Sequence, residues 1–147
     1  MLSFRRLPRL AALLAFAVVL SVAGSASAAV GSVHIAATAQ LVARGAAADI
    51  KLTATLTCDE GFDFGIVEAN VTQAHKGRLA KAFGQTRFAC DGTPQTVILR
   101  ASPGEIPFHT GPALVDADLL QCQSVSGGGG ICEFTGIETS EVTRIRR

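Results

Sequence analysis

Hydrophobic and polar positions alternate along most of the chain after residue 32. In residues 50–58 the alternation is strict: Ile50, Leu52, Ala54, Leu56 and Cys58 are separated by lysine and threonines. A period of two is typical of a β-strand with one buried and one solvent-facing side. The phase places Cys58 on the buried face, from which a disulfide can reach a second strand. We therefore predict a half-buried strand that ends at a cysteine.

The same alternation predicts further strands, over residues 33–42, 67–72, 79–83, 85–90, 95–101, 113–122 and 137–145. An Ala-rich helix over residues 36–48 is the alternative to the first of these, although Gly45 interrupts it. Polar turns are expected at residues 75–78, 91–94 and 102–104, where glycine or proline occurs. Residues 59–65, 105–112 and the glycine run 127–130 indicate loops.

The number and length of these strands predict an all-β protein. Seven or eight short antiparallel strands with no required helix favour a β-sandwich, and a closed barrel is the alternative.

The first 28 residues have the layout of a cleavable secretory signal. Arg5, Arg6 and Arg9 precede an apolar run and the small residues Ser25-Ala26-Ser27-Ala28. The run is shorter than the roughly 20 residues that span a membrane, so we expect no stable membrane insertion after cleavage. Removing residues 1–28 from 147 leaves 119, which suits one secreted, extracellular domain over residues 29–147.

All four cysteines, Cys58, Cys90, Cys122 and Cys132, follow the signal. An even number in an oxidising compartment predicts two disulfides. Four cysteines allow three pairings. We favour Cys58–Cys90 between two strands and Cys122–Cys132 around a short loop.

Charge and motifs limit the classes of function. Residues 29–147 hold ten Lys and Arg against twelve Asp and Glu, a formal charge of −2, and the sequence shows no basic run, so nucleic acid is not an expected partner. His34, His75 and His109 are scattered and no C-x-x-C pair occurs, which argues against zinc. No G-x-S-x-G motif occurs, and nothing places a nucleophile beside His109 and the aspartates that follow it. We therefore predict no enzyme activity and no cofactor.

Several short segments resemble a known group of proteins. The matching landmarks are Ala43-Arg44-Gly45-Ala46, Cys58, Val71-Thr72-Gln73, Cys90-Asp91-Gly92 and Phe108-His109-Thr110-Gly111-Pro112-Ala113. In these segments the chain resembles secreted actinobacterial proteins of unknown function with an immunoglobulin-like β-sandwich. The resemblance implies an immunoglobulin-like fold and a secreted protein, and it implies no activity. The chain contains no Trp, unlike antibody domains, whose core Trp packs on the inter-sheet disulfide.

Two polar segments are candidate binding loops. Asp59, Glu60 and Asp63 offer carboxylates, but their spacing does not match a calcium loop, so a solvated acidic loop is the favoured interpretation. In the same segment Phe62 and Phe64 are either residues at the edge of the core, which we favour, or an exposed apolar contact.

His75, Lys76 and Arg78 form a cationic turn, which is either ordinary surface or a contact for an anionic cell-wall polymer. The prediction for function is a secreted, non-catalytic module that binds a protein or a cell-envelope component. The alternative is a carrier of a small apolar ligand in a cleft of the sandwich.

Overall fold

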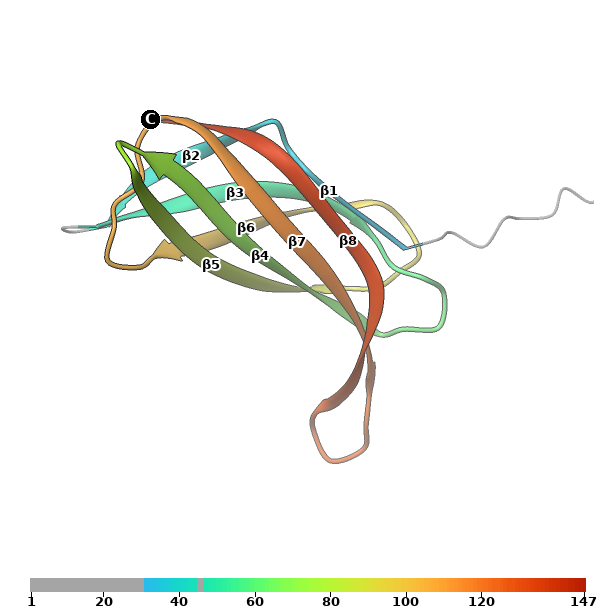
Figure 1. Cartoon of the computed structure of the whole chain (residues 1–147). Helices are drawn as coiled ribbons and strands as arrows, with labels where there is room; N and C mark the ends of the chain where they lie inside the picture. The colour runs from blue at the N-terminus through green and yellow to red at the C-terminus, as the bar shows by residue number, and fades with distance from the viewer. Residues whose placement is uncertain (1–30, 45–46) are drawn as a thin grey trace, which may run out of the picture.

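The computed structural model describes residues 31–44 and 47–147, which form strands joined by turns and loops (Figure 1). The strands are β1 (Ser32–Ile35), β2 (Thr38–Arg44), β3 (Ala47–Thr57), β4 (Phe64–His75), β5 (Arg78–Ala89), β6 (Gln95–Pro103), β7 (Gly111–Ser124) and β8 (Gly130–Arg146). The predicted signal peptide, residues 1–28, lies outside the described residues. Within them the all-β prediction is confirmed, and the helix considered for residues 36–48 is wrong where it is described, because residues 38–44 are a strand. No helix in this part of the chain could span a membrane.

The sheet closes on itself as a barrel. Its strand order is β1-β3-β2-β8-β7-β4-β5-β6, and β6 pairs back onto β3. β1 and β2 lie end to end along one edge of β3, β1 opposite residues 54–57 and β2 opposite residues 47–51. Together they occupy one position in the sheet, so the eight strands form a seven-stranded barrel. The predicted antiparallel sandwich is corrected in two respects. The strands form one closed sheet, which was the alternative, and β2 pairs with β8 in parallel.

Closure of the barrel depends on short seams. β2 meets β8 over residues 38–40 and 144–146, and β5 meets β6 through Ala82 opposite Pro103 and Phe83 opposite Ser102. A closed sheet hides the edges that would otherwise pair with other chains. These few pairs therefore complete a barrel whose other strands pair over longer stretches.

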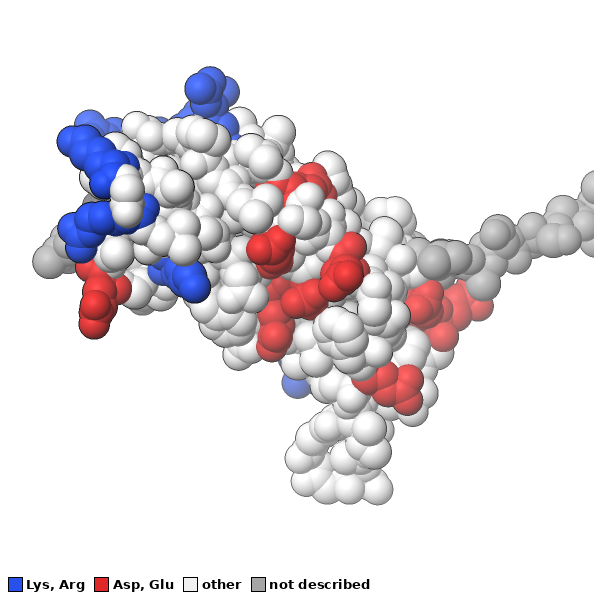
Figure 2. Space-filling view, viewed as in Figure 1, with Lys and Arg blue, Asp and Glu red and all other residues white. Residues whose placement is uncertain are grey.

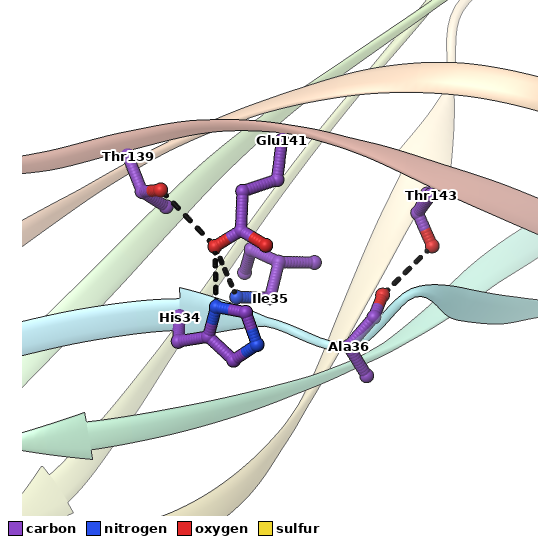
Figure 3. Close-up of polar contacts among 6 residues, drawn as sticks. All are labelled: His34, Ile35, Ala36, Thr139, Glu141 and Thr143. Carbon is purple, nitrogen blue, oxygen red and sulfur yellow. Dashed lines mark hydrogen bonds and ion pairs between the residues drawn. The ribbon is translucent and has the colours of Figure 1, made fainter.

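Side chains join β1 to β8 (Figure 3). One oxygen of Glu141 accepts hydrogen bonds from the backbone N–H of Ile35 at 3.0 Å and the hydroxyl of Thr139 at 3.1 Å, and lies 2.7 Å from Nδ1 of His34. Thr143 donates its hydroxyl to the carbonyl of Ala36 at 2.9 Å. Burial alone would raise the pKa of Glu141, but these donors and nearby His34 together lower it. The carboxylate thus occupies the place that a neighbouring strand's carbonyls would take.

The alternating residues of the strands fill the barrel. Ile50, Leu52, Ala54 and Leu56 of β3 are fully buried, as their period predicts. Both favoured disulfide pairings are confirmed. Cys58–Cys90 lies at the edge of the core, whereas Cys122–Cys132 joins paired positions of β7 and β8.

β5 is one unbroken strand, although two strands separated near Gly84 were predicted. The structure gives a different reason for this glycine. A Cβ added at position 84 would lie 2.4 Å from the carbonyl oxygen of Arg100, so the missing side chain lets β5 approach the backbone of β6 at the seam.

We expect Gly84→Ala to destabilise the protein by about 1–3 kcal/mol, because its methyl group would force the two backbones apart. The measurement is urea unfolding of the purified protein. Gly104→Ala is the matched control, since its nearest neighbour would be 3.6 Å away, at ordinary contact distance. Equal unfolding midpoints for the two variants would contradict the role given to Gly84.

Candidate binding surface

Lysine and arginine side chains gather at the end of the barrel where the chain ends (Figure 2). This basic end comprises Lys51, Lys76, Arg78, Lys81, Arg100, Arg144, Arg146 and Arg147. All of them are exposed except Lys51, which is half-buried. Residues scattered through the sequence thus form one cationic surface.

Strand register explains why these cations meet. Arg146 of β8 is level with Gln40 of β2, Gln40 with Lys51 of β3, and Lys51 with Arg100 of β6. These positions alternate with buried neighbours such as Ile50 and Ile145, so their side chains point outward. The row carries positive charge around one end of the barrel.

The turn between β4 and β5 brings more cations to this end. Arg78 pairs with His75, the last residue of β4, and Lys76 occupies the turn with a φ of 47°. Nearby, β7 begins at Gly111, which is level with Ile145 near the end of β8.

Two open hollows lie at the basic end. One, of about 670 Å³, is lined by Thr110, Gly111, Arg144, Ile145, Arg146 and Arg147. The other, of about 210 Å³, is lined by His75, Lys76, Arg78, Ile106, Pro107 and His109. The candidate residues His75, Lys76 and Arg78 therefore line one hollow together, beside an arginine-lined second one.

A buried glutamine fixes the loop that carries His109. The amide of Gln73 donates to the carbonyls of His109 and Pro112 at 3.0 and 3.2 Å, and its oxygen accepts the N–H of His109 at 2.8 Å. The rings of His75 and His109 stack with centroids 4.2 Å apart. Desolvation, then the charges of His109 and Lys76, lower the pKa of His75 below its ordinary value.

Positive and negative side chains are unevenly distributed along the barrel. Within the described part of the chain, none of the cations of the basic end forms an ion pair with a carboxylate. Asp49 and Glu105 belong to the same end, but most carboxylates lie over the middle and the other end of the barrel, as Figure 2 shows for one face. Glu68, Asp118 and Glu138 stand level on the neighbouring strands β4, β7 and β8. Positive and negative charge are thus separated along the molecule.

The other sequence candidates lie elsewhere. Phe64 is buried beneath the guanidinium of Arg87, which lies 3.5 Å from the ring centroid, and Phe62 is half-buried. Both are far from the cationic turn in the strand register.

The carboxylates proposed for the acidic loop have structural partners. Asp59 accepts the N–H of Gly31 and the side-chain amide of Gln121, and Asp63 accepts the N–H of Ser124 at 2.6 Å. The described residues contain no group of three or more His, Cys, Asp or Glu that could hold a metal ion.

Comparison of the chain with protein-family models, with curated proteins and with solved structures found no match. The resemblance to secreted actinobacterial proteins therefore stays a prediction.

Sequence reasoning found the cationic turn but missed the arginines of β8. The available signal was Arg144-Ile145-Arg146, where a buried isoleucine between two arginines points both of them outward. The linear sequence shows no basic run, because the fold brings the cations together from four strands, a turn and the residue after β8.

Proposed function

We propose that the protein is a secreted, non-catalytic module that binds a phosphate-bearing anionic polymer of the cell envelope through the basic end. The observation that carries the proposal is the gathering of unpaired lysines and arginines around two hollows at this end. Secretion is supported by the sequence of residues 1–28 and by two disulfides, which form in oxidising compartments.

The chemistry of the surface suits repeated phosphate groups. One guanidinium group can donate two hydrogen bonds to two oxygens of the same phosphate. Arg144, Arg146 and Arg147, which line one hollow, supply three such groups. Lys76 and Arg78 line the second hollow, so successive phosphates of one chain would meet cations at both. Each exposed contact is weak, and several on one polymer add up to useful affinity.

The separation of charge favours binding in one orientation. The net charge of residues 29–147 is −2, so the whole molecule does not attract polyanions. The local positive potential at the basic end attracts polyanions, while the acidic middle of the barrel repels them. Buried side chains such as Leu52, Val67 and Leu99 fill the barrel. No observation therefore favours the alternative function, a carrier of a small apolar ligand.

The test is the affinity for fluorescently labelled polyphosphate, measured by anisotropy. We expect the triple variant R144Q/R146Q/R147Q to bind about 30-fold more weakly, because it loses three exposed charge contacts that together are worth roughly 2 kcal/mol. Binding of the unmodified protein should weaken steeply with added salt.

Arg87→Gln is the matched control for the single variant Arg146→Gln, because each removes one positive charge and Arg87 lies far from the basic end. It should bind polyphosphate like the unmodified protein. Equal losses for Arg87→Gln and Arg146→Gln would contradict the proposal, as would binding that does not respond to salt. Tighter binding to duplex DNA or to phosphatidylglycerol vesicles than to polyphosphate would overturn the choice of a polymer of the envelope.

A further inference from the structure

β8 extends beyond the barrel. It pairs with β7 from Gly130 to Ile145, and together they form a hairpin that projects from the barrel in Figure 1. On its other side β8 pairs only with β2, over residues 144–146. Side chains join it to β1 near Glu141 and Thr143. Residues 130–134, the open edge, therefore have a strand on one side only within the described chain.

Large apolar side chains stand exposed on both faces of this open edge. Ile131 is 65% exposed and Phe134 63% exposed. Their partners on β7 are Gln123 and Leu120, with regular register between them, so the two side chains point to opposite faces. Exposed apolar side chains of this size offer another protein surface to bury on binding.

We propose that the open edge binds an extended polypeptide segment of another protein, which adds to β8 as a further strand. A surface laid against one face would cover only Ile131 or only Phe134. A strand added at the edge places alternate side chains on both faces and also bonds the free backbone N–H and C=O groups. This site is separate from the basic end and does not depend on the function proposed for it.

Charge indicates the kind of segment. Glu133 is exposed on the open edge, and Glu60 and Asp63 belong to the loop that bonds to the hairpin. A segment that alternates apolar and cationic residues complements this end. A second copy of the same edge carries the same carboxylates, so its negative charge does not complement this end.

The open edge is ordered before a partner binds. The Cys122–Cys132 disulfide fastens β7 to β8 at opposite positions. Asp63 holds the N–H of Ser124, and the amide of Gln123 donates to the carbonyl of Gly61 at 3.2 Å. A strand that is already ordered loses little entropy on binding. The bulge after Phe134, where Gly136 has a φ of 69°, ends the regular edge.

The experiment is a titration of the ¹⁵N-labelled protein with a synthetic octapeptide of alternating lysine and valine, followed by amide NMR and hydrogen exchange. We expect shift changes centred on residues 130–134 and slower exchange of their outward N–H groups. The variant I131K/F134K should bind at least tenfold more weakly. Val142→Lys is the matched control, because Val142 is equally exposed, at 68%, on the same strand but outside the open edge.

One further probe separates strand addition from charge attraction. A Lys-Val octapeptide N-methylated at alternate residues keeps its charge but cannot pair along its edge, so it should bind at least tenfold more weakly. Equal binding by this peptide, shifts centred on Asp116, Asp118 and Glu138, or no binding at all would overturn the proposal. So would dimers of the protein alone that pair through residues 130–134, since the occupant would then be a second copy.

Discussion

Replacing Cys58 and Cys90 with alanine is expected to lower the free energy of unfolding by about 4 kcal/mol. The bond closes a sequence separation of 32 residues, and restricting a loop of that length in the unfolded chain is worth about 4 kcal/mol in the chain-entropy model. That is a large share of the stability of a small domain. The measurement is urea unfolding of the purified variant, with the native disulfide-bonded protein as reference.

The variant C122A/C132A is the comparison. Its loop has a separation of 10, which corresponds to about 3 kcal/mol, and its bond joins a hairpin at the end of the barrel. We expect the smaller loss for this pair. A larger loss for C122A/C132A would contradict the view that Cys58–Cys90 staples the core.

Gln121→Leu is expected to cost about 3 kcal/mol. Gln121 is fully buried, and its side chain accepts the N–H of Asp59 and donates to the Asp59 carboxylate at 2.7 Å. Leucine would leave that N–H and one carboxylate oxygen without these partners beneath the surface, where an unsatisfied polar group costs about 1–3 kcal/mol and a charged one more. Urea unfolding at pH 7 measures the loss.

Gln123→Leu provides the control on the same strand. Gln123 is exposed and makes one long hydrogen bond to Gly61, so its replacement should change stability by less than about 0.5 kcal/mol. If both glutamine variants unfold at the same urea concentration, the network around Asp59 does not stabilise the fold as argued.

Much of the fold follows from the alternation of residues. In β3 and in residues 113–119 of β7 the period of two places the core correctly, because each inward residue is apolar and each strand is long enough to show the pattern. The disulfide pairing also agrees, since Cys58 directly follows β3 and Cys90 directly follows β5.

Closure of the sheet could not be predicted in the same way. It depends on pairings such as Ala82 with Pro103 and residues 38–40 with 144–146, and neither leaves a pattern within its own strand. The sequence around Gly84 predicts a break in the strand, because the contact of this glycine with a distant backbone leaves no local pattern. The N-terminal half of β8 was not predicted as a strand. The bulge at Thr135 and Gly136 places Phe134 and Ile137 three residues apart, which hides the period of two.

The binding surface was only partly predictable. The cationic turn at His75, Lys76 and Arg78 is contiguous in sequence, so it was found. Arg100, Arg144 and Arg146 join it only through strand register, and counting charges along the chain gives no sign of it. The separation of charge is a property of the folded barrel.

The most direct test of the central claim is an amide NMR titration of the ¹⁵N-labelled protein with unlabelled polyphosphate at low salt. We predict shift changes at the basic end, in residues 75–78, 109–112 and 144–147, with little change at Asp116, Asp118 and the β7–β8 hairpin. Shifts spread evenly over the barrel, or concentrated away from these residues, would contradict the assignment of the basic end as the binding surface.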